Sequence, residues 1–189
     1  MTTFFLLTGY AGSGKTTAGD CLMDLLKPYG AKKAAFADQV KLEAAKHYGF
    51  PITLAFTQEG KRSIVHTTEG PKTVRDCLID YSLEMKRRHG DDVWARQLVD
   101  RIFSISVDVP WILHDWRYLE EAQALKRSMD PARMVTVRIV RPGIKPLDTP
   151  SEHELDAVMT EHTIVNNGTV EDLRKQLGAM VRQYYPSAV

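Results

Sequence analysis

The segment GYAGSGKT at residues 9–16 constrains the fold of this chain more than any other part of the sequence. It matches the pattern G-x-x-x-x-G-K-[ST], follows an apolar run at residues 4–7 and precedes a segment with helical periodicity. Glycines in such a loop let the backbone turn its N–H groups inward, and the following helix adds its positive N-terminal end. The segment therefore predicts a phosphate-binding loop between a buried strand and a helix.

The side chains of this loop point to a nucleoside triphosphate. Lys15 can reach the β- and γ-phosphates, and the hydroxyl of Thr16 can ligate Mg²⁺. A glycine-rich turn that binds no nucleotide is the alternative, but the strand and helix on either side favour nucleotide binding. We therefore expect ATP and Mg²⁺ as cofactors. The expected cofactor-binding residues of the loop are Ala11, Gly12, Ser13, Gly14, Lys15, Thr16 and Thr17.

Strands and helices alternate along the rest of the chain. Further strands are predicted at residues 34–37, 109–114, 134–140 and 163–165, and helices at 15–26, 38–49, 73–89, 91–105, 115–129 and around 173–184. Residues 50–72 and 142–160 hold several Pro and Gly residues, so we expect loops there, the first of them irregular and mobile.

This alternation predicts an α/β protein with the three-layer P-loop NTPase fold, in which helices cover both faces of a five-stranded parallel sheet. The length of 189 residues suits a single domain, residues 1–189. Ligands of such sheets bind beyond the carboxyl ends of the strands. The loops after residues 7, 37, 114, 140 and 165 should therefore meet at one rim.

The balance of charge excludes some functions. The chain has 25 Lys and Arg residues against 24 Asp and Glu residues, so no overall positive field draws it to a nucleic acid polymer or an anionic membrane. It has no apolar stretch of membrane-spanning length, and we expect a cytoplasmic protein. Cys21 and Cys77 lie among helix-periodic apolar residues, which favours buried free thiols.

Asp115 and Arg117 stand at the end of the predicted strand 109–114. A carboxylate beside the phosphate loop can hold Mg²⁺ through water, together with Thr16, and a nearby guanidinium can neutralise a moving phosphoryl group. The alternative is that Asp115 only caps the helix that follows and that Arg117 is solvated.

Arginines gather between the second and third strands, where a phosphorylated acceptor would be clamped in a kinase. Arg75 stands out because it begins a helix, where the helix dipole and its side chain would act together. Trp94 is either a core residue, as its spacing to Leu98 favours, or a platform for an acceptor base. The arginines of this segment are Arg62, Arg75, Arg87, Arg88 and Arg96, and those suited to a lid over ATP are Arg127, Arg133, Arg138 and Arg141.

Several segments resemble, in order, the deoxynucleoside monophosphate kinases of phages and other viruses, with phosphomevalonate kinase as a looser relative. The resemblance covers almost the whole chain; its first segment is specific to a superfamily, and the others gain weight from their order. The matching segments are the phosphate loop, FAD at 36–38 with Lys41, PKTVR at 71–75 leading to Arg88 and GDDVW at 90–94, DWR at 115–117 followed by EEA at 120–122, RPG at 141–143, SE at 151–152 and IVNNGT at 164–169.

This resemblance implies an acceptor-binding helical insert at residues 38–100 and a lid with adjoining elements at about 117–160. It places Asp115, Arg117 and Arg141, with Lys15, at the transferring phosphate, and Asn167 and Gly168 at the donor adenine. The residues expected at the acceptor are Asp38, Lys41, Arg62, Arg75, Arg88 and Trp94.

The resulting hypothesis is an ATP- and Mg²⁺-dependent kinase that converts a deoxynucleoside monophosphate into its diphosphate. A kinase for another small acceptor, such as phosphomevalonate or dephospho-coenzyme A, and a regulatory P-loop ATPase are the alternatives. The expected partner is a small molecule, with no nucleic acid polymer and no membrane; the sequence leaves a homodimer open. A phage or viral source would place the protein in the host cytoplasm.

Overall fold

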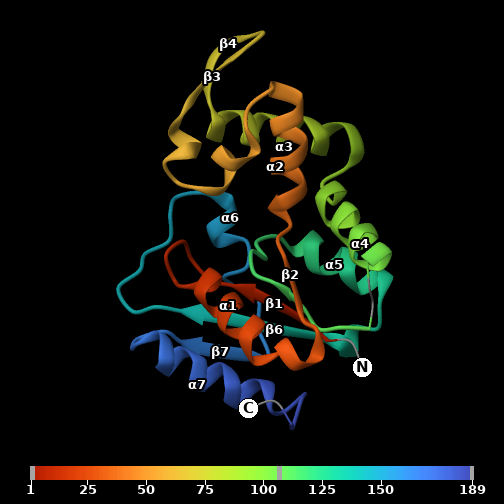
Figure 1. Ribbon diagram of the computed structural model, residues 1–189, viewed down its shortest axis with the longest axis vertical. Coiled ribbons are helices and arrows are strands. Elements are labelled where there is room, and N and C mark those ends of the chain that lie inside the picture. Colours follow the sequence, from red (N-terminus) through yellow and green to blue (C-terminus); the bar gives the residue numbers. More distant parts are fainter. Residues whose placement is uncertain (1–2, 106–107, 188–189) are drawn as a thin grey trace.

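The computed structural model describes residues 3–105 and 108–187, and its centre is a sheet of five parallel strands in the order β2-β5-β1-β6-β7 (Figure 1). The strands are β1 (Phe4–Thr8), β2 (Lys32–Ala34), β5 (Trp111–Leu113), β6 (Met134–Val140) and β7 (His162–Val165). The helices are α1 (Lys15–Leu25), α2 (Ala37–Tyr48), α3 (Val74–His89), α4 (Val93–Ile105), α5 (Leu119–Ser128), α6 (Pro150–His153) and α7 (Val170–Val181). The predicted α/β class and the five parallel strands are confirmed.

Strand β1 lies in the middle of the sheet, where both faces are covered, because its sequence FFLLT is almost entirely apolar. All five of its residues are buried. Phe5 and Leu7 pack on the side of α1 and α7, whereas Phe4 and Leu6 pack on the side of α4 and α5. Successive side chains of a strand point to opposite faces, so this alternation creates two cores and three layers.

The carboxyl ends of the strands meet at one rim, as the alternation of strands and helices predicts. The glycine-rich loop follows β1, and the residues after β5 and β7 lie beside it. The Trp116 N–H donates to the Leu7 carbonyl (3.1 Å), and the Asn166 N–H donates to the Val140 carbonyl (2.7 Å). These backbone bonds extend the strand pairing and fix the loops of the rim to one another.

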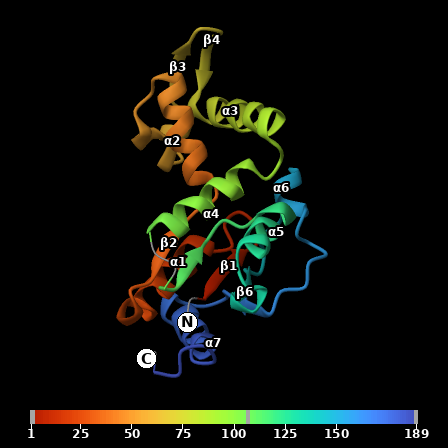
Figure 2. The same ribbon diagram turned by 90° about the vertical axis from the view of Figure 1, so that its right-hand side faces the viewer.

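The segment between β2 and β5 forms an insert that rises from the sheet and carries α2, α3 and α4 (Figure 2). Its outer part has a small core of its own. Helix α4 also packs on the sheet through Leu98 and Ile102, so the base of the insert is fixed to the rest of the molecule. The buried residues of the outer core are Ala44, Ala45, Phe50, Ala55, Val74 and Cys77.

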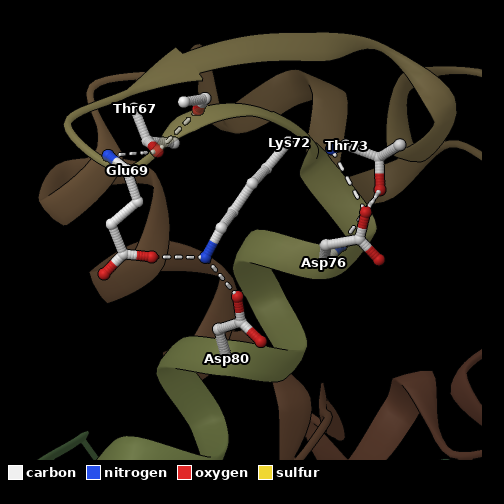
Figure 3. A network of polar contacts seen from close by, with 7 residues as sticks. Thr67, Glu69, Lys72, Thr73, Asp76 and Asp80 are labelled. Atoms are coloured by element: carbon white, nitrogen blue, oxygen red, sulfur yellow. Dashed lines mark hydrogen bonds and ion pairs between the residues drawn. The ribbon is translucent and has the colours of Figure 1, made fainter.

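An antiparallel hairpin of β3 (Ile64–Thr67) and β4 (Gly70–Thr73) forms the tip of the insert. The Lys72 ammonium group donates to Glu69 in the turn (2.6 Å) and to Asp80 on α3 (2.6 Å) (Figure 3). Thr73 and Asp76 form a capping box at the start of α3. The hairpin is therefore held to α3 by polar contacts.

The prediction of an irregular segment at residues 50–72 was wrong. This segment contains the 3₁₀ turns η2 (Ile52–Phe56) and η3 (Gly60–Arg62) as well as the hairpin. Glycine and proline are both disfavoured inside strands, so Gly70 and Pro71 led us to predict no strand here. In a ribbon of two strands, however, each strand has an outer edge, and Pro71 is tolerated there without an N–H group.

The second strand was predicted at residues 34–37 and lies instead at 32–34. The N–H groups of Ala35, Phe36 and Ala37 donate to the carboxylates of Asp38 and Asp115, which turns the chain into α2. The two lysines of β2 concealed the strand, although lysine is common on edge strands.

The cysteines and the apolar character of the helices can also be read from the structure. Cys21 and Cys77 are buried free thiols, as predicted. None of the helices within residues 3–105 and 108–187 combines the length and the apolar character needed to cross a membrane.

Candidate active site

The glycine-rich loop has the backbone geometry that its sequence predicts. Gly12 and Gly14 adopt positive φ angles of 81° and 100°, which side chains disfavour. The side-chain amide of Asn166, at the end of β7, donates to the Ser13 carbonyl (2.9 Å). A Cβ atom on Gly14 would lie 2.4 Å from that amide nitrogen, so glycine is needed there for packing as well.

Lys15 lies at the start of α1 and is 8% exposed. Its ammonium group donates to the carbonyls of Gly9 (2.5 Å) and Tyr10 (2.9 Å). Burial, and next the positive charge of Arg117, lower the pKa of Lys15 to about 8, although nearby carboxylates oppose the shift. Lys15 is thus a cation with incomplete neutralisation, and an anion in the loop would favour its charged form.

Glu152, on α6, brings the segment after β6 onto this loop. One carboxylate oxygen accepts the Ala11 N–H (2.7 Å), and the other pairs with the Arg117 guanidinium (3.0 Å). The side chain of Glu152 is 2% exposed. The predicted catalytic residue Arg117 is therefore brought to the loop, and Glu152, for which the sequence indicated no role, joins the two.

Asp115 lies at the rim but caps a different helix from the one expected. Its two oxygens accept the N–H groups of Phe36 (2.8 Å) and Ala37 (3.0 Å) at the start of α2. The alternative that Asp115 caps the helix after it was wrong, because the Glu121 carboxylate accepts the Arg117 (2.8 Å) and Tyr118 (3.1 Å) N–H groups there. Asp115 thus ties the sheet to the insert.

Glu121 is a buried carboxyl group beside Asp115. Burial, and next the negative charge of Asp115, raise the pKa of Glu121 to about 8, and bonds from two backbone N–H groups oppose the shift. A carboxyl group with such a pKa is largely protonated at neutral pH. It can then donate a hydrogen bond as well as accept one.

A cavity of about 300 Å³ lies between the rim and the insert. Helices α2, α3, α4 and α5 contribute to its walls, and Asp115 and Arg117 line it from the rim. Phe36 and Trp94 give it aromatic surface, and Lys86 adds a positive charge. Trp94 is 5% exposed, so it belongs to the core, as its spacing predicts, and also lines the cavity.

Most of the residues expected at the acceptor do not line this cavity. Arg88 pairs with Glu84 on the surface of α3, and Arg62 is exposed in η3. Asp38 and Lys41 pair with each other (3.0 Å) on α2. Arg75 donates to the side chain of Gln58 (2.9 Å).

Lys61, which the sequence did not single out, lies among the cations of the insert. Burial lowers the pKa of Lys61, followed in effect by the charges of Lys41, Arg75 and Arg117. Within residues 3–105 and 108–187 no carboxylate forms an ion pair with it. These four residues, Lys41, Lys61, Arg75 and Arg117, are here named the cation cluster. The sequence around Lys61 does not indicate that Lys61 lies near the other three cations.

A second cavity, of about 310 Å³, adjoins the other side of the loop and is lined by Gly9, Ser13 and Arg141. Arg138, a candidate for the lid, also lines this cavity and donates to the backbone carbonyls of Leu155 and Val158 (3.0 Å to the latter). Asn167 and Gly168 follow Asn166 in an exposed turn.

Comparison with known proteins supports the fold. No protein-family model matches the chain, and no curated protein is significantly similar to it. A mutant APS kinase of Mycobacterium tuberculosis matches 96% of this chain and 97% of its own, at 12% identity and a TM-score of 0.51. A sugar kinase from a Janibacter species is 16% identical (100% and 96% covered, TM-score 0.46), and a gluconokinase from Sinorhizobium meliloti 12% (98% and 97%, TM-score 0.44).

The likeness to the APS kinase structure concerns the fold, since an identity of 12% says nothing about shared substrates. Together with the parallel sheet and the glycine-rich loop between β1 and α1, it shows that the chain has the P-loop NTPase fold.

Proposed function

We propose that this protein is an ATP- and Mg²⁺-dependent kinase that transfers the γ-phosphate to a deoxynucleoside monophosphate. One observation carries the proposal: Arg117 lines the cavity below the insert and also pairs with Glu152, which accepts the Ala11 N–H of the loop. A phosphoryl group in the loop and a second molecule in the cavity would therefore both be neighbours of Arg117. Such adjacency suits transfer between two substrates.

The side chains present suit phosphoryl transfer. An oxygen of the acceptor phosphate is already anionic near neutral pH, so the reaction needs no strong general base. Catalysis then depends on positioning and on neutralising charge, which Lys15 and Arg117 would provide. The burial of Lys15 strengthens this effect, because charges interact more strongly away from water.

Magnesium would neutralise charge on the phosphates when it is bound. The part of the chain described here has no group of three or more His, Cys, Asp or Glu residues that could hold a metal ion. The Thr16 hydroxyl and one oxygen of Asp115 would be the partial ligands, since Mg²⁺ in such sites is held by one or two protein groups, water and substrate phosphates. Asp115 keeps free acceptor capacity because each oxygen accepts one N–H group.

The acceptor would lie with its phosphate at the cation cluster and its base in the cavity. The cluster has fewer carboxylates than cations, so a dianionic phosphate would relieve its repulsion. The aromatic surface of Phe36 and Trp94 suits a flat base, and the volume of about 300 Å³ suits a small molecule. The choice of a deoxynucleoside rests on the resemblance of the sequence segments described above.

The donor base would occupy the second cavity, next to Arg141. Asn167 and Gly168 directly follow Asn166, which holds the loop, and would border the donor. We further propose that the protein acts in the cytoplasm.

The test is an acceptor screen. Purified protein is incubated with ATP and Mg²⁺ and with each common ribo- and deoxyribonucleoside monophosphate, phosphomevalonate and dephospho-coenzyme A, and ADP formation and phosphorylated product are measured. We expect one or more deoxynucleoside monophosphates to give the highest kcat/KM. Transfer to another acceptor would show that the proposed acceptor is wrong but that the protein is a kinase. ATP hydrolysis that no small acceptor stimulates would contradict the proposed kinase activity.

A further inference from the structure

Glu152 makes an unusual contact for an acidic residue, because it lies against a loop built to bind anions. Its carboxylate lies between a main-chain donor, the Ala11 N–H (2.7 Å), and a guanidinium group, that of Arg117 (3.0 Å). With the side chain 2% exposed, this is a desolvated anion with charge-assisted bonds on both oxygens. The two donors are of the kind that otherwise binds a phosphate.

The position of this carboxylate along the loop indicates which phosphate it resembles. The loop ends at Lys15, where α1 begins, and the N–H groups at that end would cradle the α- and β-phosphates. Ala11 lies in the first half of the loop, away from the helix, and faces Arg117 through Glu152. A terminal phosphate that extends toward Arg117 would need the donors that Glu152 uses.

We propose that Glu152 is a built-in competitor for the terminal phosphate of the nucleotide. This inference rests on the proposed function, because it requires nucleotide binding in the loop. ATP has to displace the carboxylate, whereas ADP, which has no third phosphate, leaves it in place. Arg117 then exchanges Glu152 for the γ-phosphate, so it reaches the transferring group only when ATP is bound.

The segment around Glu152 permits this exchange. Helix α6 has only four residues, and residues 145–150 before Glu152 are almost all exposed. The residues after it are fixed, because Arg138 holds the carbonyls of Leu155 and Val158 and Tyr10 donates to Asp156 (2.9 Å). Glu152 can therefore leave the loop by a local movement on a fixed base.

The experiment compares ATP and ADP binding to the wild type and to Glu152→Gln, by calorimetry with Mg²⁺ and a non-hydrolysable ATP analogue. Glutamine keeps the shape but removes the charge that holds Arg117. We expect the variant to bind the ATP analogue about fivefold more tightly or better, a coupling of the usual allosteric size, with ADP affinity nearly unchanged. Asp148→Asn is the matched control, since it removes an exposed charge from the same segment.

Different results would contradict the role of Glu152 and the proposed function. If the wild type binds both nucleotides but Glu152→Gln leaves the ratio of their affinities unchanged, or weakens ATP binding, the competitor is rejected and the proposed function stands. If the wild type binds neither nucleotide, both claims fail.

Hydrogen exchange on the wild type covers the case in which the variant does not fold. The ATP analogue should increase amide exchange in residues 151–153 relative to ADP, because α6 is released from the loop. Equal exchange with the two nucleotides would overturn the proposal.

Discussion

The glycine-rich loop and the cavity below the insert are neighbours built by different means. The loop is one continuous segment whose backbone would form the binding surface, and Asn166 fixes it at Ser13. The cavity is assembled from side chains of four helices and the rim. The cation cluster beside it combines residues from α2, η3, α3 and the segment after β5.

The two regions differ in how readily a substitution can change them. A loop made of main-chain groups depends on glycine geometry and tolerates few substitutions. A cavity lined by side chains can change its shape or charge by one substitution while the sheet and the loop stay intact. We therefore expect changes at the loop to abolish transfer and changes at the cavity to shift the acceptor KM.

The largest effect is expected at the loop. Lys15→Ala should lower kcat by about 1,000-fold or more, because it removes the buried cation that neutralises the phosphates. Steady-state kinetics with circular dichroism as a check on folding would measure it. A folded variant with retained transfer would contradict the assignment of the loop.

Arg117→Ala sharpens the comparison because Arg117 belongs to both regions. We expect kcat to fall by about 100- to 1,000-fold with a smaller change in the KM for ATP, since its charge would act mainly on the moving phosphoryl group. Arg174→Ala is the control, because Arg174 pairs with Asp24 on the outer surface and such pairs contribute little. Equal losses of kcat in Arg117→Ala and Arg174→Ala would contradict a catalytic role for Arg117.

Lys61→Ala tests the cation cluster alone. The KM for the acceptor should rise about 10- to 100-fold, as expected for the loss of one charged phosphate contact, with the KM for ATP unchanged. Lys46→Ala removes an exposed lysine from α2 and should change neither constant. A rise in the KM for ATP instead would place Lys61 on the donor side.

The protonation of Lys15 gives ATP binding at the loop a pH dependence. Its pKa of about 8 is set by burial, and ATP favours the charged form, so ATP affinity should fall as pH rises through about 8. Titration of the ATP affinity between pH 6.5 and 9.5 would show it. An affinity that is flat over this range would mean that Lys15 stays charged without ATP.

The smallest effect is expected at Glu121 and concerns the stability of the fold. Its folded pKa of about 8 lies above the unfolded value, so the folded state binds more protons and stability should fall as pH rises from about 4.5 to 8. Glu121→Gln should flatten this decline in the Tm because glutamine carries no titratable proton and can still accept the two N–H groups. An unchanged pH profile would contradict the raised pKa.

The sequence predicts much of the fold and the loop because both depend on local patterns. The apolar run of β1, the periodicity of α1 and the glycines between them lie in one segment. The strand β2 was predicted two to three residues too late, and the hairpin β3–β4 escaped prediction, because lysines, Gly70 and Pro71 obscure the strand pattern.

The rest of the site depends on contacts between distant residues. Glu152 meets Ala11 across 141 positions, and Asp115 meets Phe36 across 79. Neither the spacing nor the residue type indicates such a contact. Arg62 and Arg88 were expected at the acceptor by their type, yet both are exposed. Lys61, in the same turn η3 as Arg62, instead lies near enough to Lys41 and Arg75 for their charges to lower its pKa.

If the loop and the cavity are two halves of one transfer site, a bisubstrate analogue should bind across both. Such a molecule joins adenosine to the deoxynucleoside found in the acceptor screen through a polyphosphate chain. Its Kd, measured by calorimetry, should be at least about 100-fold below that of ATP and should rise in both Lys15→Ala and Lys61→Ala. An affinity no better than that of ATP, and insensitive to Lys61→Ala, would contradict the account.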